Sequence, residues 1–101
     1  KVLWMRDLHK IVRVSCASFH SGFVDNNGNV FTCGVGLDYR LGHGDQNTLY
    51  QPKQVIACNK LKICQIECVD TRSFVITTDG DLLSWGKDPI SGRTNKLPFI
   101  Y

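Results

Sequence analysis

The sequence has no long apolar run and no strong excess of either charge. No stretch of about 18 apolar residues occurs in it, and the N-terminal segment KVLWMRDLHK lacks the apolar core of a signal peptide. The 12 Lys and Arg residues, set against 9 Asp and Glu, give a formal charge of +3 and are scattered along the chain. Membrane insertion is therefore not expected, and a concentrated nucleic-acid-binding patch is disfavoured. These features predict an intracellular protein of the cytoplasm or nucleus.

Methionine is scarce and does not begin the chain. The first residue is Lys1 and the only methionine is Met5, so we expect the sequence to be an excerpt from a longer chain. Its 101 residues, 43% of them hydrophobic, suffice for one small domain with a modest core.

The cysteines number five, and an odd number without a secretory signal argues for reduced thiols rather than disulfides. Cys58, Cys64 and Cys68 are close in sequence, but no CxxC pair exists. Residues four apart on a strand share one face, where cysteine commonly packs as a small apolar group. We therefore expect no metal site.

Motifs of catalysis and cofactor binding are also missing. The glycine-rich segment GVGLDYRLGHG contains no GxxxxGK[ST] motif, and Tyr39 stands where GxGxxG requires its third glycine. None of His9, His20 and His43 forms a recognisable pair with a nucleophile. No catalytic residue and no cofactor are predicted, so the chain by itself is not expected to be an enzyme.

What the sequence does contain is an internal repeat. Residues 11–34 align without a gap with residues 63–86, at an offset of 52 residues. Among the identical residues are four pairs: Cys16 and Cys68, Ser21 and Ser73, Gly28 and Gly80, Gly34 and Gly86. Both cysteines of the first pair are expected to be buried at equivalent positions.

Local signals within each copy are those of β-structure. Asn27-Gly28 and Asp79-Gly80 predict two-residue hairpin turns of type I′, with positive φ at the glycines. Short runs rich in Val, Ile, Phe and Thr predict strands near residues 11–16, 20–24, 29–33 and 53–57, and near 62–68, 73–77 and 81–85. About four short antiparallel strands per repeat is the size of one β-propeller blade. A two-sheet sandwich is the structural alternative.

The segment CGVGLDYRLGHGD, followed by QPKQV, resembles the regulator-of-chromosome-condensation repeat. The matching positions are Cys16, His20, Gly28, Gly34, Leu41, Gly42, Gly44, Asp45 and Pro52 in the first copy, and Cys68, Gly80, Trp85 and Gly86 in the second. The departures are Cys33 for Trp, Gly36 for Asn, Tyr39-Arg40 for Gly-Gln and Arg72 for His. Gly92-Arg93, one residue out of register, resembles the Gly-Gln step, and TNKLPFIY does not complete the Leu-Gly-x-Gly-Asp pattern.

This resemblance implies an all-β fold of two four-stranded antiparallel blades from a seven-bladed propeller. Residues 1–10 would be a linker or the end of a preceding repeat, 11–60 the first blade, and 61–101 a second, incomplete blade. The remaining blades of the parent chain would be the first partner of these two.

The resemblance also implies a role in protein–protein interaction. Alternatives are part of a guanine-nucleotide exchange factor for a small GTPase, or a chromatin-binding propeller. Tyr39, Arg40, His43 and Asp45 form the candidate interaction loop, because Tyr and Arg are frequent interface anchors. His20 is expected to hold neighbouring backbone, Trp85 to pack between blades, and His43 to be solvated.

Overall fold

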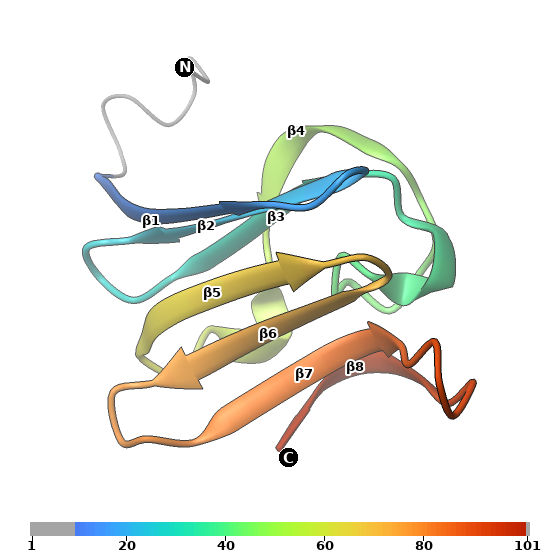
Figure 1. Cartoon of the computed structure of the whole chain (residues 1–101). Helices are drawn as coiled ribbons and strands as arrows, with labels where there is room; N and C mark the ends of the chain where they lie inside the picture. The colour runs from blue at the N-terminus through green and yellow to red at the C-terminus, as the bar shows by residue number, and fades with distance from the viewer. Residues whose placement is uncertain (1–9, 101) are drawn as a thin grey trace.

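The computed structural model describes residues 10–100 and contains two four-stranded antiparallel sheets, each with its strands in sequence order (Figure 1). The first sheet comprises β1 (Ile11–Cys16), β2 (His20–Asp25), β3 (Val30–Gly34) and β4 (Leu49–Gln54). The second comprises β5 (Ile63–Val69), β6 (Arg72–Thr77), β7 (Leu82–Lys87) and β8 (Thr94–Ile100). Two short 3₁₀ helices, η2 (Leu37–Tyr39) and η3 (Ile56–Cys58), lie in the connections. His9 and most of the predicted linker lie outside the described residues.

The two sheets repeat one pairing register. Arg13 pairs with Val24 after a bulge in β1, and Gln65 pairs with Ile76 after the same bulge in β5, exactly 52 residues later. The β2–β3 and β6–β7 ladders correspond in the same way. The sequence repeat is therefore a structural repeat, and the predicted all-β fold is confirmed.

The hairpin turns carry the predicted glycine conformation but not the predicted turn type. Gly28 and Gly80 have φ of 84° and 93°. Asn27 and Asp79 are not in the left-handed region, which a type I′ turn would require of them. Instead, the amide of Asp25 donates to the carbonyl of Asn29, so the loop is longer than a two-residue turn, and Gly28 is its one left-handed residue.

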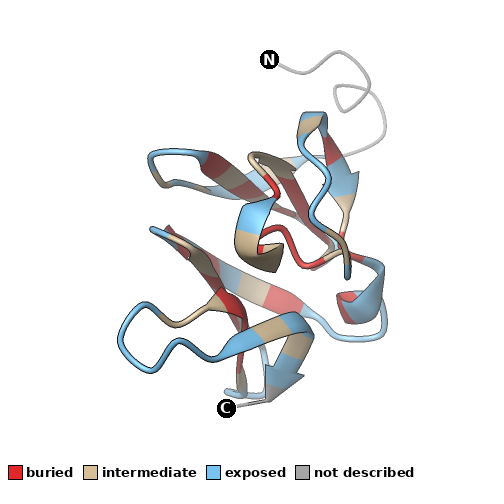
Figure 2. Ribbon diagram, turned by 90° about the vertical axis from the view of Figure 1, so that its right-hand side faces the viewer, coloured by how far each residue is buried: buried red, intermediate tan, exposed pale blue. Residues whose placement is uncertain are grey.

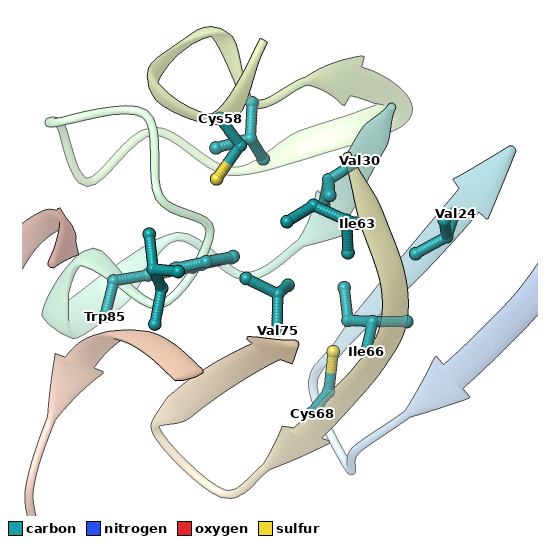
Figure 3. Close-up of a cluster of buried hydrophobic side chains, with 10 residues drawn as sticks. Val24, Val30, Cys58, Ile63, Ile66, Cys68, Val75 and Trp85 are labelled. Atoms are coloured by element: carbon teal, nitrogen blue, oxygen red, sulfur yellow. The ribbon is translucent and has the colours of Figure 1, made fainter. Parts of the chain in front are cut away.

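The main core lies between the two sheets (Figure 3). Its members are Val24, Val30, Val55, Cys58, Ile63, Ile66, Cys68, Val75, Leu83 and Trp85. Each fully buried aliphatic side chain of this kind contributes about 1.5–3 kcal/mol to folding. Gly22 of β2 permits the close approach of the sheets, because a Cβ there would overlap Ile66 of β5. Buried residues accordingly concentrate on the facing strands and in the centre of the β3–β4 connection, whereas the turn between β7 and β8 and the turn between β6 and β7 are largely exposed (Figure 2).

The expectation that Cys16 and Cys68 are both buried is half wrong. Cys68 is buried because its face of β5 packs against β1 and β2. Cys16 is exposed, because no described element covers the equivalent face of β1. The same sequence position therefore has different surroundings in the two copies.

The fourth strand of each sheet differs from what the sequence predicted. β4 begins at Leu49 and ends at Gln54, earlier than the predicted 53–57, and residues 56–58 form η3 instead. The segment TNKLPFI, which matched no repeat motif, forms β8 and pairs with β7.

Candidate functional site

The connection between β3 and β4, residues 35–48, is anchored to the second sheet. The carbonyl oxygen of Arg40 accepts two hydrogen bonds, one from Trp85 Nε1 at 2.8 Å and one from Ser73 Oγ at 2.7 Å. Gly42 lies against the Trp85 ring, where an added Cβ would come within 2.8 Å of Nε1. The loop is therefore held at its centre by side chains of β6 and β7.

His20 takes part in the same contact. Because the Ser73 hydroxyl proton points to the Arg40 carbonyl, Ser73 Oγ must accept the second hydrogen bond, and His20 Nε2–H donates it at 2.9 Å. Burial, followed by the Arg40 charge, lowers the pKa of His20 to about 4, against a smaller opposing effect of the Arg72 backbone. The ring is neutral at physiological pH and joins the two sheets.

His43 is not solvated as expected. Thr32 Oγ1 donates to the carbonyl of Leu41 at 2.7 Å, and His43 Nε2–H donates to Thr32 Oγ1 at 2.9 Å. Burial and the Lys53 charge lower the pKa of His43, while Asp45 opposes this shift. The histidine is half-buried because the loop folds back over β3.

The Arg40 side chain is buried and stabilises its own loop, so it is not an exposed interface residue. Its side chain is buried, its Nε donates to the Leu37 carbonyl at 2.8 Å, and its Nη2 lies 3.6 Å from Asp38 Oδ2. Of the candidate interaction loop, Tyr39, Asp45 and His43 remain partly accessible, and Leu37 beside them is 56% exposed.

Tyr39 has an unusual backbone conformation. Its φ is 60°, and that of the preceding Asp38 is 61°. Such left-handed conformations cost on the order of 1–3 kcal/mol in a non-glycine residue and persist only where neighbouring contacts hold them. Here the Asp38 amide donates to Gln46 Oε1 at 3.0 Å, and Lys96 Nζ of β8 lies 5.2 Å from the centre of the Tyr39 ring. The ring is thus fixed at the junction of the two sheets.

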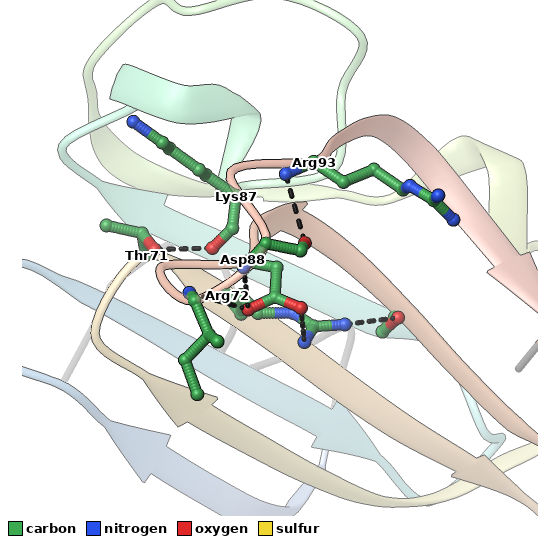
Figure 4. A network of polar contacts seen from close by, with 8 residues as sticks. Thr71, Arg72, Lys87, Asp88 and Arg93 are labelled. Atoms are coloured by element: carbon green, nitrogen blue, oxygen red, sulfur yellow. Dashed lines mark hydrogen bonds and ion pairs between the residues drawn. The ribbon is translucent and has the colours of Figure 1, made fainter.

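The connection between β7 and β8 lies at the same end of the sheets (Figure 1). Asp88 organises it: Oδ1 accepts from the Ile90 amide at 2.9 Å, and Oδ2 lies 3.8 Å from Arg72 Nη1 (Figure 4). The Ile90 hydrogen bond is the largest cause of the lowered pKa of Asp88. Ile90 itself is 96% exposed at the tip of this ordered turn.

Sequence reasoning missed Ser73, Ile90 and Lys96. Ser73 was seen only as a repeated residue, because its partner lies 33 positions away in a loop. Asp-Pro-Ile-Ser-Gly is a turn signal that could have drawn attention to Ile90. Nothing in the sequence brings Lys96 to Tyr39.

Among residues 10–100, no three His, Cys, Asp or Glu side chains are grouped closely enough to hold a metal ion. All five cysteines are free thiols. No helix in this part of the chain is long and apolar enough to cross a membrane.

The sequence matches the family model of the regulator of chromosome condensation (RCC1) repeat over residues 27–76. This match begins in the turn before β3 and ends in β6, so one sequence repeat takes two strands from each sheet.

Curated relatives are identical to the chain at about a third of the aligned positions. It is 37% identical over 78 residues to the X-linked retinitis pigmentosa GTPase regulator homolog of Caenorhabditis elegans, covering 77% of this chain and 6% of that protein. It is 35% identical over 83 residues to the ultraviolet-B receptor UVR8 of Arabidopsis thaliana, covering 81% of this chain and 19% of the receptor. The chain thus spans only a small part of these relatives.

Solved structures show the same fold. Human WBSCR16 aligns with a TM-score of 0.84 at 24% identity, over 93% of this chain and 26% of that one. Yeast RCC1 (Prp20), solved bound to Kap60, aligns with a TM-score of 0.78 at 22% identity, over 94% of this chain and 26% of that one. The chain belongs to the RCC1 repeat family, and its two sheets are β-propeller blades.

Proposed function

We propose that the chain is a protein-interaction module whose contact site is the loop surface, defined as Leu37, Tyr39, Ile90, Arg93 and Lys96. One observation carries this proposal: Tyr39 occupies a left-handed position that the repeat pattern fills with glycine. A strained residue is maintained at a functional site more readily than elsewhere. Tyr is also among the residues that most often dominate binding energy at protein interfaces.

The test separates binding from folding by replacing Tyr39 with glycine in the full-length protein. Tyr39→Gly relieves the backbone strain, so the melting temperature should stay equal or rise. Loss of the ring should weaken the binding of a partner that uses the loop surface about 30-fold, which corresponds to the ~2 kcal/mol of an interface hot spot. Tyr50→Ala is the matched control, because Tyr50 is a 93% exposed tyrosine on β4 that is not part of the loop surface.

Partners would be identified by capture with both variants, and their affinities measured by calorimetry. A partner counts only if Tyr39→Gly weakens it and Tyr50→Ala does not. If every captured partner binds Tyr39→Gly as tightly as the unchanged protein, the loop surface is not the contact site.

A second candidate, part of a guanine-nucleotide exchange factor, is favoured by the relative named as a GTPase regulator homolog. Prp20p of Saccharomyces cerevisiae, a structural neighbour at 18% identity, was studied for binding to Gsp1p and histones. The discriminating measurement is release of fluorescent GDP from a small GTPase in the presence of the full-length protein. Unchanged release rates would reject the exchange role. Chromatin binding is a weaker candidate, since the cations of the chain are scattered.

The chain itself would act without catalysis and without a cofactor. An intracellular location is part of this proposal, supported by five free thiols and by the kind of relatives that it has. The domain ranges 11–60 and 61–101 likewise remain proposals, with the two sheets lying inside them.

A further inference from the structure

The turn between β2 and β3 contains an asparagine that is followed by a glycine. The chain has asparagine at positions 26, 27, 29, 47, 59 and 95, and only Asn27 is followed by glycine, Gly28. The main-chain nitrogen after an asparagine can attack the side-chain carbonyl carbon of that asparagine. Glycine hinders this attack least, because it has no side chain. By sequence, Asn27 is therefore the asparagine most open to this reaction.

The structure leaves the Asn27 side chain accessible. Asn27 is exposed, and its side-chain amide makes no hydrogen bond within the part of the chain that the structure describes. By contrast, the side-chain amide of Asn29 is held by Asp25 and Gln54. One contact opposes the attack, the hydrogen bond of 3.1 Å from the Gly28 amide to the Asp25 carbonyl. Because this bond must open first, Asn27 should react more slowly in the folded protein than in a free peptide.

A neighbouring blade of a propeller would leave this turn accessible. Asp79 of the second blade corresponds to Asn27, and it is exposed although the first blade packs against the second. The turn of the first blade contacts Lys62 and Ile63 instead, at the start of β5. By the same repeat, the turn of another blade would contact the start of β1 and leave Asn27 exposed.

We propose that Asn27 is a site of spontaneous deamidation and that its isoaspartate product weakens the contact between the blades. Gly28 N bonds to the side-chain carbonyl carbon of Asn27, the bond from that carbon to the amide nitrogen breaks, and ammonia leaves with the proton of Gly28 N. Water then opens the resulting five-membered ring at either carbonyl. One product is aspartate on an ordinary backbone. The other is isoaspartate, whose backbone runs through the side chain and is one atom longer.

The two products affect the blade contact differently. Aspartate is already present at the same position of the second turn, as Asp79, so the turn accepts it. Isoaspartate displaces Gly28, which has little room: a Cβ on it would lie 2.7 Å from Lys62 Cγ and 3.0 Å from Ile63 N. The Gly28 carbonyl accepts from Ile63 N at 3.1 Å, so its displacement breaks this hydrogen bond between the blades.

This site is independent of the proposed interaction role. The turn precedes β3, whereas the connection that carries Leu37 and Tyr39 follows β3, so the two lie at opposite ends of the strand (Figure 1). Deamidation at Asn27 changes no residue of the loop surface.

The test ages the full-length protein in mildly alkaline buffer and maps its peptides by mass spectrometry. Conversion of amide to acid should occur at Asn27 before any other asparagine. An isoaspartyl methyltransferase, which labels isoaspartate but not aspartate, should label the same peptide. Asn27→Gln should abolish this label, because glutamine must form a larger ring. Asn59→Gln is the matched control and should keep the label, because Asn59 is an exposed turn asparagine followed by Lys60.

Hydrogen exchange of the Ile63 amide measures the effect on the blade contact. In the isoaspartate fraction of the aged protein, separated by ion exchange, this amide should exchange about fivefold faster, as expected for the loss of one hydrogen bond. Freshly prepared Asn27→Asp carries the acid on an ordinary backbone and should exchange like the unchanged protein.

Three results would overturn the proposal. The first is acid product at another asparagine before Asn27. The second is no product at Asn27 while the capped peptide Asp-Asn-Asn-Gly-Asn reacts in the same buffer. The third is unchanged exchange of Ile63 in the isoaspartate fraction. Partner binding to the loop surface is measured separately with Tyr39→Gly, so the two proposals fail in different experiments.

Discussion

His20 and Trp85 both act through one main-chain oxygen, the carbonyl of Arg40. His20 reaches it through Ser73, and Trp85 reaches it directly. A buried neutral imidazole stabilises the fold only while it stays uncharged. The contact between the blades should therefore respond to acid.

The pH dependence follows from the His20 pKa, which is about 4 in the folded chain and 6.5 as its ordinary value. Between these values the unfolded chain binds a proton that the folded chain does not, so stability falls as the pH drops from 6.5 to 4. The loss should reach up to about 3 kcal/mol. Urea unfolding at pH 7 and pH 4.5 measures it, and His20→Gln should make the dependence shallower. An unchanged slope in His20→Gln would mean that the ring titrates normally.

The sequence predicted Tyr39 as a site residue but could not predict its geometry. Its left-handed backbone adjoins a hydrogen bond within the loop, from the Asp38 amide to Gln46, and its ring lies near Lys96, which comes close only when the second sheet has formed. Arg40 was misplaced for the same reason. Its burial follows from contacts that the loop makes with itself and with β6 and β7, and no local pattern encodes these.

The elements that the sequence predicted well are those within the gap-free repeat. β1, β2, β3, β5, β6 and β7 all lie within one or two residues of their predicted ranges. The fourth strands, β4 and β8, were harder to predict, because each contains a proline and much exposed polar surface. Proline is tolerated on an edge strand, where its missing amide faces solvent. The six-residue difference in connection length then hid the equivalence of β8 with β4.

The two hairpin turns offer a matched pair of substitutions. Gly80→Ala should cost about 1–2 kcal/mol, the penalty of a left-handed alanine, because no atom lies within 4 Å of the added Cβ. Gly28→Ala carries the same penalty and also places its Cβ 3.0 Å from Ile63 N of the second blade. It should weaken the bond from Ile63 N to the Gly28 carbonyl and cost about 1 kcal/mol more. Urea unfolding of both variants measures the difference, and equal losses would show that the turn does not support the blade contact.

At the scale of the whole molecule, the contact between the blades is built from both backbone and side chains. Ile63 N donates to the Gly28 carbonyl, and Cys68 N donates to Ser15 Oγ. Separation of the blades would break these bonds and expose the main core. We therefore expect the blades to separate only when the chain unfolds as a unit.

The cysteines can show whether the blades separate before the chain unfolds, since they differ in accessibility. Burial raises the pKa of Cys58 to about 11 and that of Cys68 to about 12, whereas Cys16 is exposed. In a pulse of iodoacetamide under native conditions, Cys16 should be alkylated first. Cys58 and Cys68 should react only at the rate of global unfolding, which amide hydrogen exchange at Val75 measures independently. If Cys68 reacts while the Val75 amide stays protected, the blades open as rigid units about a hinge, and the contact between them is weaker than the sheets themselves.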